Sequence, residues 1–356
     1  MQRLQHILFG LPPPPPPATN DKSSVSGSSP GNYQPSISDV LQVKETLLEK
    51  LPLELIDVVI DAAEYWPHTT SINTPPAESP FCIRGDANHE NQFILRTPPL
   101  GFVPVSDWRN TTADTDTITD VGPELEGTGR LSWSLDTSPK LAQSSDIPQA
   151  KGSLTDEVLK GWEATSNPRE KFPCRKIVFT IRSRDQGWGG SSADRGSYRG
   201  SFTWFDVGLE RMIAYREGTT ADDKEYDSTP SSTCESPIVC STYTVLPAAA
   251  PAPNPDDPPN ASDHPLLPGP MCIQKNVTAD QTAKEHRIVW SVDDNINPES
   301  PEADELENRG RGRATATGEF VRNLKLGDSV TVWQKARFHG WANFLEYLKV
   351  EVYWAV

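Results

Sequence analysis

The chain has 356 residues, of which 34 are proline and 35% are hydrophobic, and its mean hydropathy is −0.54. We therefore expect one core of moderate size, because long polar and proline-rich stretches bury too little apolar surface to fold. The formal net charge of −16 argues against general nucleic-acid binding, which requires clustered lysine and arginine. Two basic segments, 171–216 and 309–356, indicate either basic strands bordered by acidic loops or a local site for an anionic ligand.

The five cysteines form no CxxC pair and have no histidine-rich neighbourhood, so we predict no metal site and no cofactor. The apolar run at 7–9 is too short for a secretory signal, and no other window is long enough to span a membrane. A cytoplasmic or nuclear protein that does not bind membranes is the expectation. Because no secretion is predicted, we do not expect N-glycosylation at the triplets that begin at Asn110, Asn260 and Asn276.

The amino-terminal part divides into a tail and a helical segment. Residues 1–35 combine polyproline with a Ser/Gly/Asn tract, which is typical of a disordered tail. Residues 36–67 carry apolar side chains at helical spacing and predict two short helices. Pro52 suits the first turn of the second helix, and Pro67 ends it.

The rest of the chain predicts a mostly-β fold. Residues 68–171 are interpreted as linker and loops with one strand near 93–96, and residues 172–356 as an antiparallel β-sandwich. Disordered insertions are expected near 217–270 and 293–313. The sandwich strands are expected at 176–182, 201–207, 241–246, 271–277, 286–292, 318–324, 328–338 and 347–355.

A glycine-rich turn between the first two of these strands is the candidate ligand site. Arg184 could form a fork with an anionic group, while Asp185 and Gln186 could hydrogen-bond to hydroxyl groups. Trp188, together with Trp341 in a second turn, could stack on a sugar ring. The alternative is structural, with Asp185 bound to the backbone amides of its own turn and both indoles capping the sandwich.

The sequence contains no catalytic signature. Its acid-rich stretches lie in predicted loops, which cannot hold paired carboxylates in a fixed geometry. Of the six histidines, only His286 and His339 fall within predicted structure, and Ser183 and Ser192 have no nucleophile elbow. We therefore predict that the protein is not an enzyme.

The carboxyl-terminal block resembles a fungal family of uncharacterised proteins, which share the motifs RDQGW, TWFD, GWANF and VYWAV. The matching stretches are RKIVFTIRSRDQGWGG at 175–190, GSFTWFDVGLER at 200–211, GRGRATATGEFVRNLKLGDSVTVWQKARFHGWANF at 310–344 and VEVYWAV at 350–356. The layout of that family is similar to the galactose-binding-like sandwiches attached to F-box proteins, the phloem-lectin type among them. The resemblance implies a jelly-roll sandwich that recognises a ligand, although fold alone does not fix function.

The second predicted helix resembles the opening of an F-box. Leu51, Pro52, Glu54, Leu55 and Ile56 match its LPxEL-hydrophobic start. This resemblance implies docking on an adaptor of cullin ubiquitin ligases. The alternative is an amphipathic helix that packs against the sandwich.

Together these features predict a non-enzymatic recognition module. In this hypothesis an F-box-like adaptor binds a glycan or peptide ligand through the loop around 185–188. The alternative hypothesis is a structural or protein-interaction domain with no small-molecule ligand.

Overall fold

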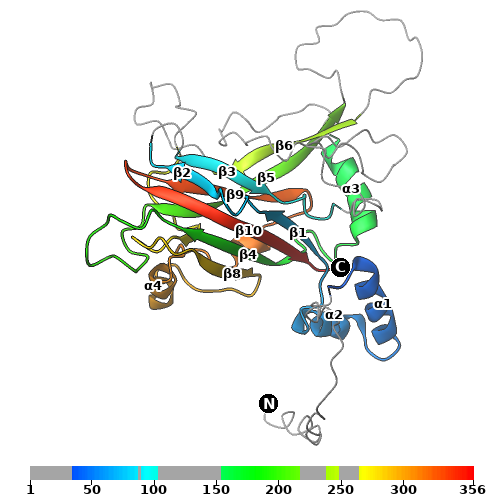
Figure 1. Ribbon diagram of the computed structural model, residues 1–356. Helices are drawn as coiled ribbons and strands as arrows, with labels where there is room; N and C mark the ends of the chain where they lie inside the picture. Colours follow the sequence, from blue (N-terminus) through cyan, green and yellow to red (C-terminus); the bar gives the residue numbers. More distant parts are fainter. Residues whose placement is uncertain (1–33, 87–89, 103–153, 217–237, 248–263) are drawn as a thin grey trace, which may run out of the picture. The chain divides into compact units, whose positions relative to one another are not determined.

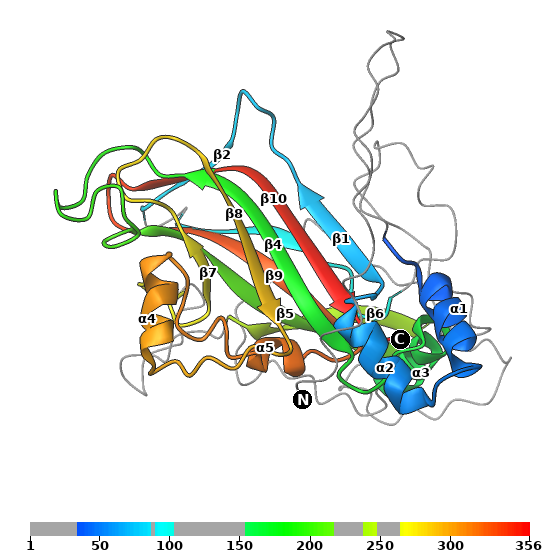
Figure 2. The same cartoon turned by 90° about the horizontal axis from the view of Figure 1, so that it is seen from below.

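A computed structural model describes residues 34–86, 90–102, 154–216, 238–247 and 264–356 (Figure 1). In these described residues the fold is mostly β, and ten strands form two antiparallel sheets. The two sheets pack face to face around a shared apolar core (Figure 2). The predicted mostly-β antiparallel sandwich is therefore confirmed.

The first sheet is built around β10, the longest of its strands. The order is β1-β10-β4-β8. β2 and β1 lie on the same side of β10: β2 pairs with its first residues, 342–345, and β1 with residues 348–353. Its strands are β1 (His68–Asn73), β2 (Phe81–Arg84), β4 (Cys174–Arg184), β8 (Lys284–Ser291) and β10 (Ala342–Trp354).

The second sheet is built around β5, whose fourteen residues pair with three other strands. The order is β3-β9-β5-β6. β7 and β6 lie on the same side of β5: β7 pairs with residues 204–206 of β5 and β6 with residues 209–216. Its strands are β3 (Asn91–Arg96), β5 (Thr203–Arg216), β6 (Ile238–Leu246), β7 (Cys272–Lys275) and β9 (Asp328–Ala336).

Alternating side chains of both sheets fill the core. Ile177 and Phe179 of β4 share it with Phe205 of β5 and Val332 of β9, all buried. Trp354 of β10 belongs to the same cluster. Alternation in a half-buried strand places every second side chain on the inner face, which is how the sequence pattern identified these strands.

The interpretation of residues 68–171 as linker with one strand is wrong in part. The expected strand near 93–96 is β3, but β1 and β2 also lie in this range, as does α3 (Thr155–Ser166). β1 and β2 are edge strands that pair with β10 on one side. β1 has a single apolar residue, Ile72, and β2 is only four residues long, so neither gives a strong alternating pattern in the sequence. α3 packs Val158 and Trp162 against the far end of β5.

Two further expectations differ from the structure. The stretch 293–313, expected as a disordered insertion, contains α4 (Pro301–Asn308), and 318–324, expected as a strand, contains the short helix α5 (Glu319–Arg322). Buried Ala303 and Leu306 anchor α4, a spacing of three that suits a helix. Within 217–270, β6 is a strand, and the remaining predicted insertion falls largely outside the described residues, as does the predicted tail up to residue 33.

Two helices precede the sandwich, as the sequence predicted. α1 (Ile37–Leu48) begins with a capping box between Ser36 and Asp39, and α2 (Leu53–Ala62) follows Pro52. Both helices pack on the sandwich, because Val40 of α1 and Ile56 and Ile60 of α2 are buried in the main core. None of the helices in the described part of the chain has the length and apolar character that a membrane crossing requires.

The burial of Trp354 gives a test of the strand at the end of the sequence. We predict that Trp354→Ala lowers the free energy of unfolding by about 3–5 kcal/mol, because the cavity would lie in the shared core. Ile72→Ala, an exposed position on β1 of the same sheet, should change it by less than about 1 kcal/mol. Denaturant unfolding measures both, and equal stability of the two variants would contradict the inner position of Trp354.

Candidate functional site

The glycine-rich loop after β4 is held by a buried carboxylate. Asp185 is fully buried, and its Oδ1 accepts a hydrogen bond from Gly187 N at 2.7 Å while its Oδ2 accepts one from Ala279 N at 2.6 Å. Burial raises the pKa of Asp185, although these backbone donors act in the opposite direction. Asp185 therefore fastens its own turn to residue 279, which is the structural role given above as the alternative, and its contact with a ligand stays a prediction.

Gln186 joins this loop to the turn between β9 and β10. Its Nε2 donates to the Trp188 carbonyl oxygen at 2.6 Å, and its Oε1 accepts from Ala342 N at 2.9 Å. Both ends of the amide are thus engaged within the protein. Gln186 therefore positions the two turns relative to each other, and its contact with a ligand stays a prediction.

The two predicted tryptophans do come together, and each packs on glycine of the other turn. A Cβ atom on Gly340 would lie 3.0 Å from the Trp188 ring, and one on Gly189 or Gly190 would lie 3.9 Å from the Trp341 ring. Gly340 has a φ of +92°, which favours glycine independently of the space. This reciprocal packing holds both indoles in place without covering Trp188, which remains 62% exposed.

Two phenylalanines extend this surface. The Phe202 ring meets Trp341 edge to face at 5.1 Å between centroids and Phe338 at 4.7 Å. Phe338 is 45% exposed. We call Trp188, Phe202, Phe338 and Trp341 the aromatic platform.

The backbone at Phe338 is strained. Its φ is +64°, a left-handed conformation that a bulky residue adopts only where its surroundings require it. Such strain is most common at binding and catalytic sites. Sequence reasoning missed Phe338, because it placed the residue at the end of a regular strand; the only local signal was its position two residues before Gly340.

A buried polar network lies beneath the platform, between the two sheets. Asn276 accepts from the Ser183 hydroxyl at 2.7 Å and donates to Asn343 Oδ1 at 2.8 Å and Thr203 Oγ1 at 3.1 Å. Asn343 in turn donates to the carbonyl oxygens of Trp204 and Lys335, both at 3.0 Å. Since Asn276 is buried and fully engaged, the triplet that begins there is not a surface glycosylation site in this fold.

A second buried group of polar side chains lies on the outer face of the second sheet. The Nζ atom of Lys335 contacts the His264 ring. The same Nζ atom lies 3.8 Å from the Asp206 carboxylate. Burial lowers the pKa of Lys335 to about 8, and burial and the nearby cations lower that of His264 to about 3. Arg337 Nη2 donates to the Pro265 carbonyl oxygen at 2.8 Å. These contacts fasten residues 264–265 to β9.

Two of the residues considered for catalysis, His286 and Ser183, have structural partners. Tyr198 Oη and His286 Nε2 share a hydrogen bond of 2.8 Å, and burial lowers the pKa of His286 to about 4, so the imidazole is neutral near pH 7. Ser183 is bound to Asn276, as described above. Across the described residues, His, Cys, Asp and Glu side chains do not gather in groups of three that could hold a metal ion.

The F-box-like residues fall on two sides of α2. Ile56 is completely buried in the sandwich core and Leu51 is half-buried against it. Both side chains thus pack in this structure, and their contact with a partner stays a prediction. Pro52, Glu54 and Leu55 are exposed. The outward face of the helix is apolar, with Leu55 at 51% and Val58 at 63% exposure.

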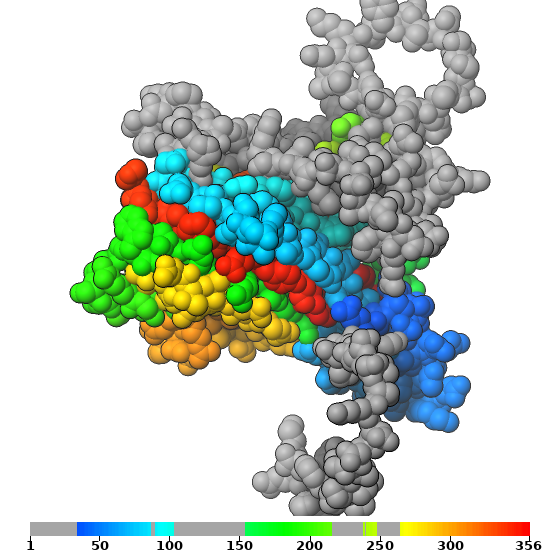
Figure 3. All heavy atoms as spheres, viewed as in Figure 1, coloured from blue at the N-terminus to red at the C-terminus, as the bar shows by residue number. Residues whose placement is uncertain are grey.

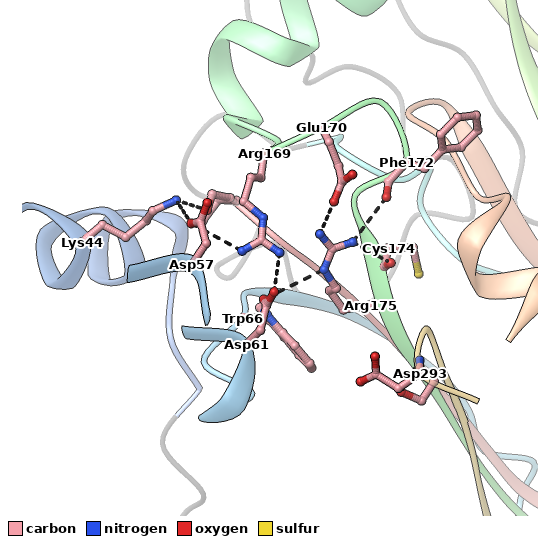
Figure 4. Close-up of polar contacts among 12 residues, drawn as sticks. Lys44, Asp57, Asp61, Trp66, Arg169, Glu170, Phe172, Cys174, Arg175 and Asp293 are labelled. Carbon is pink, nitrogen blue, oxygen red and sulfur yellow. Dashed lines mark hydrogen bonds and ion pairs between the residues drawn. The ribbon is translucent and has the colours of Figure 1, made fainter. Parts of the chain in front are cut away.

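Ion pairs fix the inward side of α2 to the start of β4 (Figure 4). Arg169 lies between two carboxylates of the helix, 2.6 Å from Asp61 and 3.4 Å from Asp57. Lys44 of α1 lies 2.9 Å from Asp57 and also donates to the Val356 backbone oxygen at 2.8 Å. Burial raises the pKa of Asp57, but Lys44 and Arg169 outweigh it and hold that pKa below its usual value.

No family model matches this chain, and no curated protein or solved structure does so either. The function must therefore be inferred from the geometry of its own residues.

The different positions of Asp185 and Trp188 predict different costs of substitution. Asp185→Ala should lower the free energy of unfolding by about 1–3 kcal/mol, because two buried N–H groups lose their acceptor. Trp188→Ala, at an exposed ring, should lower it by about 1 kcal/mol or less. Denaturant unfolding compares the two, and a larger loss for Trp188→Ala would mean that the indole is a structural cap.

Proposed function

We propose that this protein is a non-enzymatic recognition module that binds a glycan or peptide ligand on the aromatic platform. The observation that carries the proposal is the exposed Trp188 indole, which packs on Gly340 in the turn that also holds the exposed Phe338. A large aromatic ring left in solvent offers a flat apolar face for stacking. Its fixed position lowers the entropy lost when a ligand binds.

A glycan is the better fit of the two ligand classes. The apolar face of a sugar ring matches a single exposed indole, whereas a peptide added as a strand would bind along a sheet edge. The edge strands of the first sheet in the described residues are β1, β2 and β8, and the exposed Trp188 lies on none of them but in the loop after β4. The resemblance to galactose-binding-like jelly rolls supports the same choice at the level of fold.

The proposal predicts that a substitution at Trp188 removes ligand binding without unfolding the protein. Wild-type protein should be retained on an array of oligosaccharides with micromolar to millimolar affinity, in the range of shallow sites. Trp188→Ala should abolish this retention, since it removes the stacking surface, and should keep the melting temperature within a few degrees. Phe172→Ala, at an exposed aromatic residue before β4, is the matched control and should bind like wild type.

Absence of any retained oligosaccharide or peptide would reject the proposal. The platform would then be a cap on the sandwich, and the chain a structural or protein-interaction domain without a small ligand.

A second function, docking on an adaptor of cullin ubiquitin ligases, is favoured by the apolar outer face of α2. Leu53, Leu55 and Val58 are exposed on a helix whose opposite side is fixed to the sandwich. An exposed apolar helix face of this kind is typical of protein-interaction surfaces. The match to the F-box opening makes such an adaptor the partner to test first.

Pull-down with a purified adaptor tests this second function. Wild-type protein should recover the adaptor, and the double variant Leu55→Glu with Val58→Glu should lose at least about tenfold, because two charges would enter an apolar interface. Leu267→Glu, an exposed leucine elsewhere in the chain, is the control. Equal recovery by the double variant, or no recovery by wild type, would reject adaptor docking through this face.

A further inference from the structure

Two arginines lie on the outer face of the first sheet, next to the aromatic platform. Strand pairing sets Arg84 of β2 opposite Ala342 of β10, and Arg184 of β4 opposite Phe344 of β10. Strands lie about 4.8 Å apart and rise about 3.4 Å per residue, so the two Cα atoms are about 12 Å apart. Figure 3 views this side of the molecule, where β10 runs between the strands that carry the two arginines.

Neither guanidinium is fully neutralised. Arg84 is exposed and has no ion pair within the described residues. Arg184 lies over the Phe344 ring at 4.1 Å and only 3.8 Å from Glu346, whose closer partner is Arg182 at 2.8 Å. A chain with a net charge of −16 therefore presents two available cations at one end of one sheet.

Cys82 lies between the two arginines, and both of their charges affect the pKa of its thiol. Cys82 pairs with Phe344 and so stands beside Arg84 on the same strand and across β10 from Arg184. Burial raises the pKa of the Cys82 thiol, while Arg84 and Arg184 both act to lower it. The two guanidinium groups thus act on one small region of the surface.

This region is continuous with the aromatic platform. Gly85, the residue after Arg84, donates its N–H to the Trp341 carbonyl oxygen at 2.9 Å. Arg184 directly precedes the loop that carries Trp188. Within that loop, exposed Arg195 donates from Nε to the Gly189 carbonyl oxygen at 3.2 Å, which brings a third cation close to Trp188.

We propose that the ligand of the platform is an acidic oligosaccharide, with Arg84 and Arg184 binding its carboxylate or sulfate groups while a sugar ring stacks on Trp188. The proposal rests on the proposed function of the platform. Guanidinium forks match the planar geometry of a carboxylate and the oxygens of a sulfate. The acidic remainder of the chain repels a long polyanion, which favours a short ligand with few charges over a nucleic acid.

The test compares sugars that differ only in charge. Hexagalacturonate should bind the full-length protein at least about tenfold more tightly than its neutral methyl ester, and raising NaCl from about 50 to about 500 mM should remove most of the difference. Sulfated maltohexaose, measured against maltohexaose, distinguishes sulfate from carboxylate as the preferred anion. Isothermal titration gives the affinities.

Substitution then assigns the charges. Arg84→Gln should weaken hexagalacturonate binding about five- to tenfold and leave the methyl ester unchanged, and Arg184→Gln should do the same. Because Arg184 also stacks on Phe344, Arg84→Gln is the decisive variant if Arg184→Gln proves unstable. Arg287→Gln is the matched control: Arg287 is exposed on β8 of the same face, without an ion pair in the described residues, about 14 Å from Arg184.

The outcomes separate the two proposals. Equal affinity for hexagalacturonate and its methyl ester, with both lost in Trp188→Ala, would overturn the acidic ligand and keep the recognition function. Binding of neither sugar form nor of the sulfated pair would overturn both. Tighter binding of oligothymidylate or of a hexaglutamate peptide would also overturn the acidic oligosaccharide.

Discussion

The hydrogen bonds of Asn276 and Asn343 hold the two sheets together at the end where the candidate site lies. They connect β4 and β10 of one sheet with β5 and β9 of the other. Buried amides are costly unless they are paired, so this network tolerates few alternative arrangements of the strand ends. The loops that leave these strands consequently start from fixed positions.

From those fixed ends the surface geometry follows. Asp185 closes the glycine-rich turn, Gln186 joins it to the turn before β10, and each turn packs its tryptophan on glycine of the other. The stabilising contacts are thus made by the polar side chains and by the inner faces of the rings. Trp188 itself stays exposed, which is the arrangement expected of a preorganised stacking site.

Charge is distributed in the same way. Near the start of β4, Arg169 and Lys44 form ion pairs with the carboxylates of α2 and so hold the helix against the sandwich. At the other end of β4, Glu346 is shared between Arg182 and Arg184, and Arg84 has no partner among the described residues. One strand therefore carries structural ion pairs at one end and available positive charge at the other, within an acidic chain.

The sequence by itself determined the mostly-β sandwich, because the alternation of Ile177 and Phe179 reflects a local property of strands. It also located the glycine-rich loop that carries Trp188, but left open whether this indole stacks on a ligand or caps the sandwich. Only the tertiary structure decided which polar residues there are structural: Asp185 and Gln186 find their partners at residues 279 and 342, far away in the sequence. The same holds for Arg84 on an edge strand and for the buried Ile56, whose positions depend on packing partners that no local pattern specifies.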